Sequence, residues 1–245
     1  MMKLLQGDCL EIMPTLEAQS FDAIIADIPY GTTACSWDTV IPFAPMWEQL
    51  KRLAKPRAAI VLFGSQPFTS ALVMSNPQMF RYEWAWNKVT AHGLRAKYRP
   101  VMLHENILIF SKESPRYYPI KTQRNRPIRQ KIRSVSKSAN LSSIDGEWRV
   151  YSDINPKSIL EFQNRNGGGK FHPTQKPVAL MEYLIRTYTN EGDTVLDFTM
   201  GSGSTLVAAV NTNRNGVGIE LREDYYDIAQ RRVQEAQAQI KMELA

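Results

Sequence analysis

Short apolar runs recur along the chain and alternate with segments in which apolar residues return every three or four positions. Runs of the first kind predict buried strands, at 21–26, 58–63, 82–86, 106–110, 194–198 and 217–219. Segments of the second kind predict helices, at 43–54, 178–188, 204–211 and 223–239. In one of these helices Leu180, Leu184 and Tyr188 are spaced four residues apart, so they belong to the core. The alternation predicts an α/β fold, with a mostly parallel sheet and helices on both of its faces.

The composition is that of a globular chain. Of its 245 residues 43% are hydrophobic, which is enough for a sizeable core. No apolar run approaches the roughly 20 residues of a membrane span, and the first five residues lack the features of a signal peptide. We therefore expect a cytoplasmic protein that does not bind a membrane. We also expect neither a disulfide framework nor a metal site, because the few cysteines and histidines lack ligand spacing: Cys9, Cys35, His92, His104 and His172.

Charge divides the chain unevenly. Residues 112–170 hold 13 Lys or Arg against five acids, a net charge of +8, and the rest of the chain carries −2. This segment lacks strand or helix periodicity and ends in the glycine-rich stretch 164–169, so it is predicted to be an irregular, basic insert. Tyr117, Tyr118 and Trp148 interleave with the charges, which favours contact with nucleic acid. A solvated linker is the alternative.

Four residues directly after the strand at 21–26 carry distinct chemistry: Asp27, Ile28, Pro29 and Tyr30. A carboxylate, a backbone carbonyl beside proline and an aromatic face are what a protein needs to hold a flat ring that bears an amine, such as a nucleobase. An ordinary turn at a strand end is the alternative.

A second candidate site follows the strand at 194–198. The turn at 199–203 contains Gly201 and Gly203 and leads into a helix, as in nucleotide cradles. Glu220 lies 23 residues beyond Asp197, where an acid can bind the two hydroxyls of a ribose. A dinucleotide fingerprint would require a third glycine where the chain has Leu206. Since Asp197 suits an ammonium group, the pattern favours S-adenosylmethionine over NAD, with a tight strand-to-helix turn as the plain alternative.

Together these motifs resemble those of amino-group DNA methyltransferases. The tetrapeptide at 27–30 is similar to their Asp-Pro-Pro-Tyr catalytic motif, with Ile28 in place of the first proline. The segment 197–203 is similar to their cofactor motif, although some relatives have other residues in place of Thr199 and Met200. The segment 172–177, His-Pro-Thr-Gln-Lys-Pro, resembles the element that helps to hold the methionine end of the cofactor. The order of the motifs is that of the β class.

The resemblance covers residues from about 5 to 233, except the insert. It implies a single Rossmann-like domain with a mostly parallel seven-stranded sheet. In this arrangement residues 1–111 form a catalytic half, residues 112–170 a target-recognition insert, and residues 171–245 a cofactor-binding half.

The resemblance also implies roles for particular residues. The catalytic set is Asp27, Ile28, Pro29 and Tyr30. The cofactor set, for S-adenosyl-L-methionine, is Asp8, Cys9, Asp27, Thr174, Lys176, Asp197, Phe198, Gly201, Ser202, Gly203, Ser204, Thr205, Glu220 and Leu221. The DNA-binding set is Trp86, Lys88, Arg124, Arg126, Arg129, Lys131 and Arg133. For four of these residues plainer roles stay open: helix capping for Thr174 and Lys176, a core position for Trp86, and an ordinary surface position for Lys88.

The implied reaction is direct methyl transfer to the exocyclic N6 amine of a flipped adenine. Related enzymes that act on the N4 amine of cytosine often carry serine where this chain has Asp27, so adenine is favoured and cytosine N4 is the alternative. An RNA methyltransferase and an inactive DNA-binding relative are further alternatives. Methylation at cytosine carbon 5 needs a cysteine nucleophile beside proline, and neither Cys9 nor Cys35 has that context. The implied partner is double-stranded DNA, and a homodimer and a cognate restriction endonuclease are further candidate partners.

Overall fold

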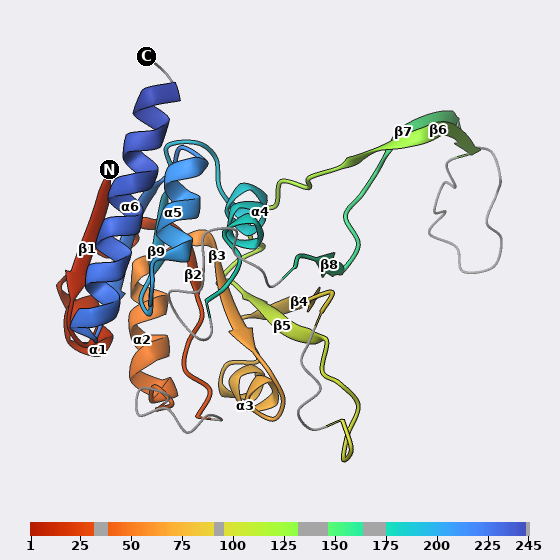
Figure 1. The fold of residues 1–245 in the computed structure, drawn as a ribbon. Coiled ribbons are helices and arrows are strands. Elements are labelled where there is room, and N and C mark those ends of the chain that lie inside the picture. Colours follow the sequence, from red (N-terminus) through yellow and green to blue (C-terminus); the bar gives the residue numbers. More distant parts are fainter. Residues whose placement is uncertain (32–38, 91–95, 132–146, 164–174, 244–245) are drawn as a thin grey trace. The chain divides into compact units, whose positions relative to one another are not determined.

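The computed structural model describes residues 1–31, 39–90, 96–131, 147–163 and 175–243. Among these residues, eight strands form one sheet in the order β1, β10, β9, β2, β3, β5, β4, β8 (Figure 1). The strands of this sheet are β1 (Met2–Gln6), β2 (Phe21–Ala26), β3 (Ala54–Gly64), β4 (Phe80–Asn87), β5 (His104–Phe110), β8 (Ile159–Glu161), β9 (Thr194–Asp197) and β10 (Asn215–Glu220).

The sheet is mostly parallel, as predicted. The five strands from β1 to β3 run parallel to their neighbours, β5 is antiparallel to both β3 and β4, and β8 is parallel to β4. The expected number of seven strands is corrected to eight. The segment expected to be an irregular insert supplies β8, a three-residue strand whose backbone pairs with the end of β4.

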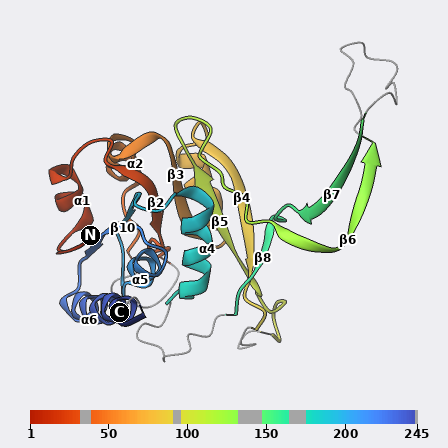
Figure 2. The ribbon, with the colours of Figure 1, turned by 90° about the horizontal axis from the view of Figure 1, so that it is seen from above.

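Helices cover both faces of the sheet, in agreement with the α/β prediction. They are α1 (Cys9–Ile12), the short 3₁₀ helix η1 (Met13–Thr15), α2 (Phe43–Leu53), α3 (Phe68–Ser75), α4 (Val178–Tyr188), α5 (Ser204–Asn211) and α6 (Glu223–Glu243). Figure 2 shows α2 on one side of the central strands and α4 and α5 on the other. None of the helices among the described residues is long and apolar enough to cross a membrane.

The central strands are buried on both faces, which explains why they read as unbroken apolar runs. In β2 every residue is buried: Ile24 and Ala26 face the core that contains α2, and Ala23 and Ile25 face the core that contains α4. A third cluster joins α5 to α6 through Leu206 and residues of α6. The rigid sheet therefore fixes where β2 and β9 end, and both proposed motifs start at those ends.

Residues Pro119–Lys157 form a second compact unit. It contains the antiparallel pair β6 (Thr122–Lys131) and β7 (Trp148–Ile154), visible as a two-stranded ribbon in Figure 1. The expectation of an irregular segment at 112–170 was therefore wrong for these stretches. Both strands are almost wholly exposed, so they lack the buried face whose alternating pattern would have revealed them.

Candidate active site

The tetrapeptide at 27–30 follows β2 at the edge where parallel strands end. The backbone oxygen of Asp27 accepts a hydrogen bond of 3.2 Å from the Thr199 hydroxyl, which belongs to the glycine turn after β9. Since β2 and β9 are paired neighbours, the sheet places the two predicted motifs side by side. In open α/β sheets ligands bind in this position, beyond the carboxyl ends of the strands.

Both carboxylate oxygens of Asp27 are engaged by side chains. The hydroxyl of Tyr30 donates to Oδ1 at 2.7 Å, and the ammonium of Lys176 donates to Oδ2 at 2.5 Å. Burial raises the pKa of Asp27 above its ordinary value, Lys176 opposes this rise, and the nearby charge of Glu105 adds to it. The site therefore holds a carboxylate that is a strong acceptor once it is ionised, because little water competes for it.

A chain of alternating charges extends from this carboxylate. Lys176 lies 3.3 Å from Glu105 Oε2, and Glu105 Oε1 forms an ion pair with Lys88. Burial favours the neutral form of Glu105, yet Lys176 and Lys88 together hold its pKa below the ordinary value. For Lys176, burial lowers the pKa, but the carboxylates of Asp27 and Glu105 raise it overall. Lys176 is thus a buried cation in an ionic network.

Aromatic rings form one wall of the site. The Tyr30 ring stacks on Phe68 of α3 with centroids 5.1 Å apart and an interplanar angle of 30°. The Lys176 ammonium lies over the Tyr30 ring and, at 5.1 Å, over the Phe63 ring. Ile28 is buried in the core, so only its backbone is available to a ligand. Acid, ring and backbone carbonyl are close enough in sequence and space to grip one flat, amine-bearing molecule.

The glycine turn uses its two glycines differently. Gly201 has φ +51° and nothing within 4 Å of the place where a Cβ would stand, so a ligand can approach its backbone. Gly203, the residue before α5, has φ +80°, and a Cβ there would lie 2.9 Å from the Cβ of Ala229 in α6. Gly203 therefore allows close packing of the turn against α6, and Gly201 leaves room for a ligand.

Buried side chains hold this turn in place. Asp197 accepts from the backbone N–H of Thr199 at 3.1 Å and from the Thr205 side chain, and burial raises its pKa to about 7. Ser202 and Ser204 are buried as well, and both contact the guanidinium of Arg232 in α6. Phe198 packs in the core. These predicted cofactor residues hold the conformation of the turn through buried contacts.

Glu220 lies at the end of β10, beside the turn. Its carboxylate accepts from the N–H of Gly201 and from the N–H of Arg222, each at 2.9 Å. The next residue, Leu221, is 63% exposed, which leaves its side chain available to a flat ring.

The end of β1 reaches the same place, because Gln6 pairs with Glu220 and the Gly7 N–H donates to the Glu220 carbonyl. Asp8 caps α1 by accepting from the Leu10 N–H at 2.7 Å. Cys9 is half-buried, and burial together with the nearby Asp8 carboxylate raises its pKa to about 12. The thiol therefore stays protonated at neutral pH, and a nucleophilic role does not suit it.

The structure places the residues predicted to bind DNA in two different parts of the chain. Trp86 is 1% exposed and donates its indole N–H to the Phe162 carbonyl, which agrees with the core alternative. Lys88 is paired with Glu105 and is not a free surface lysine. The remaining described members, Arg124, Arg126, Arg129 and Lys131, all lie on β6 in the second unit.

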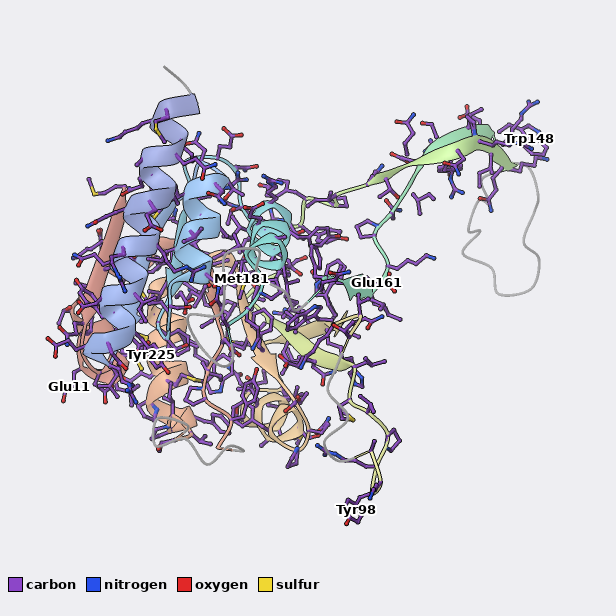
Figure 3. All side chains as sticks on the ribbon, in the orientation of Figure 1. Glu11, Tyr98, Trp148, Glu161, Met181 and Tyr225 are labelled. Carbon is purple, nitrogen blue, oxygen red and sulfur yellow. The ribbon has the colours of Figure 1, made fainter. Side chains whose placement is uncertain are left out.

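In that unit Arg126 and Arg129 are exposed, whereas Arg124 donates to the Asp153 carbonyl. The Arg129 guanidinium lies over the ring of Trp148, 5.0 Å from its centroid, and Figure 3 shows Trp148 near the end of the hairpin. Trp148 is 55% exposed. An exposed ring beside exposed guanidinium groups is suited to stacking on bases and to pairing with phosphates.

Several predicted residues lie outside the part of the chain that the structure describes: Thr174, Arg133, Cys35, His92 and His172. Two contributors were missed from the sequence. Glu105 lies just before the strand predicted at 106–110, and the contact of Arg232 with the glycine turn spans about 30 positions. The one sequence signal for Glu105 is an acid two residues before the apolar run at 107–110.

Comparison with known proteins adds a family match. The model of the N6/N4 DNA methylase family matches residues 21–231. The Type II methyltransferase M.HpaI of Haemophilus parainfluenzae is 31% identical over 246 residues, which is 94% of this chain and 74% of that protein.

Solved structures share the fold. The complex of M1.HpyAVI with SAM has a TM-score of 0.64 at 23% identity and covers 95% of this chain and 99% of that one. The cytosine-N4-specific PvuII DNA methyltransferase has a TM-score of 0.69 at 17% identity, with 98% and 92% covered. At these identities the likeness is one of fold.

Proposed function

Since the chain belongs to the N6/N4 DNA methylase family, we propose that it transfers a methyl group from S-adenosyl-L-methionine to the exocyclic N6 amine of adenine in double-stranded DNA. The observation that carries this proposal is the contact between the two motifs. The amine-binding tetrapeptide and the glycine turn meet through the hydrogen bond from Thr199 to Asp27. An acceptor for a base amine therefore lies beside the place where a nucleotide-like cofactor fits.

The glycine turn and the residues at the end of β10 fit the cofactor. Gly201 leaves open space, Glu220 presents a carboxylate suited to the ribose hydroxyls, and Leu221 exposes an apolar face for the adenine ring. Asp8 follows the strand that pairs with β10, close to the same end of the site. When bound, the cofactor supplies an electrophilic methyl group carried on a sulfonium.

The tetrapeptide acts on the base. An exocyclic amine is a weak nucleophile because its lone pair is delocalised into the ring. The Asp27 carboxylate and a backbone carbonyl of the Ile28–Pro29 turn accept its two N–H hydrogens, which localises the lone pair toward the methyl group. Tyr30 stacks on the base, which has been turned out of the duplex. Alignment of the two reacting centres supplies much of the rate enhancement.

Adenine is proposed over cytosine because the first residue of the tetrapeptide is an acid, Asp27. Related enzymes that act on the cytosine amine often carry serine at this position. Cytosine N4 is the second candidate, because a cytosine-N4-specific enzyme shares the fold. Analysis of nucleosides by mass spectrometry after reaction decides between them, since methyladenine supports the proposal and methylcytosine alone overturns it.

The basic region is proposed to bind the DNA. Of the expected insert at 112–170, the compact unit Pro119–Lys157 contributes the exposed Arg126, Arg129 and Trp148. Contacts to phosphates make affinity depend steeply on salt. A homodimer and a cognate restriction endonuclease are further proposed partners, and sedimentation with and without DNA measures the first of these.

The experiment that tests the function uses the full chain, labelled cofactor and DNA. Wild-type protein is expected to transfer the label, and Asp27→Ala to bind the cofactor with nearly unchanged affinity while transfer almost disappears. Asp227→Ala, an exposed aspartate in α6, is the matched control and should behave as wild type. Cofactor binding without transfer to DNA by the wild type would point to an inactive relative, and transfer to RNA alone would point to the RNA alternative.

A further inference from the structure

Lys176 is shared between two carboxylates. Its side chain is only 6% exposed, and its ammonium lies 2.5 Å from Asp27 Oδ2 and 3.3 Å from Glu105 Oε2. The rings of Tyr30 and Phe63 lie below the ammonium, which confines it to this polar cluster. The ammonium therefore lies closer to Asp27, its first position, and a small movement would bring it closer to Glu105, its second position.

The first position conflicts with the proposed use of Asp27. Oδ1 already accepts from Tyr30 and Oδ2 from Lys176. An ammonium is a stronger donor than a base amine, so it competes for the same lone pairs and reduces the acceptor strength left for the amine. Each carboxylate oxygen has two lone pairs, so an amine hydrogen can reach Oδ2 beside the ammonium, but the bond to the amine becomes stronger when the ammonium moves away.

The second position is prepared in the structure. Glu105 Oε2 is buried, and among the described residues it has no hydrogen-bond partner, while Oε1 is paired with Lys88. Lys176 already forms an ion pair with this oxygen at 3.3 Å, and a short movement of the ammonium would turn that ion pair into a well-formed hydrogen bond. The positive charges of Lys88 and Lys176 balance the negative charges of the two acids, Asp27 and Glu105. Lys176 can therefore move from one acid to the other without a proton transfer.

We propose that Lys176 moves from Asp27 to Glu105 when the target amine enters, so that Glu105 acts as a positioning residue for Asp27. This inference rests on the proposed function, because it concerns the substrate amine. In the free protein Lys176 neutralises Asp27. In the complex the amine hydrogens take the place of the ammonium, and Glu105 keeps the lysine charge paired.

The test is a double-mutant cycle in single-turnover methyl transfer, with Glu105→Gln, Lys176→Met and the combined variant. Glu105→Gln removes the second position, so transfer is expected to slow by about tenfold to a hundredfold, the scale of one hydrogen bond to a charged group. Cofactor affinity should stay unchanged. In the Lys176→Met background the same substitution should have little further effect, because Glu105 acts through Lys176.

Two variants separate this role from packing. Glu105→Asp keeps the charge and should recover part of the rate lost in Glu105→Gln, and thermal melting checks that each variant is folded. Glu83→Gln alters an exposed acid on the neighbouring strand β4 and should match wild type.

Equal losses from Glu105→Gln in both backgrounds would overturn the inference, as would full activity of Glu105→Gln or a parallel loss of cofactor affinity. A wild-type protein without transfer activity would instead refute the proposed function.

Discussion

The hydroxyl of Tyr30 donates a hydrogen bond of 2.7 Å to Asp27 Oδ1, so the ring and the acid of the tetrapeptide are oriented together. This bond favours the ionised carboxylate, and it works against the burial that raises the pKa of Asp27. Orientation of the ring and ionisation of the acid are thus coupled.

Tyr30→Phe should keep the stacking surface and remove this hydrogen bond. We expect transfer to slow about tenfold to a hundredfold, the scale of one hydrogen bond to a charged group. Because Asp27 must be ionised to accept the amine, activity falls as pH falls through its pKa. Loss of the bond raises that pKa, so the acidic limb of the pH–rate profile should move to higher pH. An unmoved limb would contradict the coupling, and Tyr30→Ala, which also removes the ring, should be slower still.

Glu220→Ala should weaken cofactor binding. The carboxylate orders the turn through the N–H groups of Gly201 and Arg222, and it is also proposed to bind the ribose. We expect the Kd measured by calorimetry to rise at least tenfold. A tenfold change in Kd corresponds to about 1.4 kcal/mol, and a hydrogen bond to a charged group contributes more than that. Glu223→Gln, an exposed neighbour at the start of α6, is the control. An unchanged Kd for Glu220→Ala would remove Glu220 from the cofactor site.

Gly203→Ala should destabilise the protein more than Gly192→Ala. Both glycines have φ near +80°, so both substitutions carry the same backbone strain of roughly 1 kcal/mol. Only at Gly203 would the new Cβ meet Ala229, whereas at Gly192 nothing lies within 4 Å. Overpacking adds about 1–3 kcal/mol, so the free energies of unfolding in urea should differ by that amount. Equal losses in the free energy of unfolding would show that α6 moves away from the new Cβ at little energetic cost.

Asp197→Asn should stabilise the free protein at alkaline pH. The folded-state pKa of Asp197, about 7, lies above the ordinary value of 3.8, so the folded state binds this proton more tightly than the unfolded state. The contribution of Asp197 to wild-type stability should therefore fall as pH rises from about 4 to about 7, by a few kcal/mol in order of magnitude.

The uncharged asparagine avoids this loss. Urea unfolding of both proteins at pH 5 and pH 8 should show the gain growing with pH. A gain of the same size at both values would contradict the assignment to Asp197.

The strands at the centre of the sheet could be predicted because burial on both faces leaves an unbroken apolar run, as in β2. The strand β1 was not predicted, since it lies at the edge of the sheet and its residues are only partly buried or exposed. The helix α3 is as apolar as a buried strand, so no polar face marked it as a helix.

The site was predictable only where its parts are local in sequence. Asp27 and Tyr30 are three residues apart, and the glycines of the turn are two apart. By contrast, Lys176 reaches Asp27 across 149 positions, and it was expected to hold the cofactor instead. Such pairings are fixed by the order of strands in the sheet, which the pattern along the chain does not specify.

The compact unit Pro119–Lys157 is connected to the rest of the chain at only two peptide bonds, after Tyr118 and before Ser158. Its two strands pair with each other and with no strand of the main sheet among the described residues. Substitutions, insertions or a wholesale exchange inside this hairpin therefore leave the strand pairs under the candidate active site intact. Under the proposed function, a lineage that carries this protein changes its DNA contacts without rebuilding the main sheet, and an engineer could graft a foreign hairpin at the same two junctions.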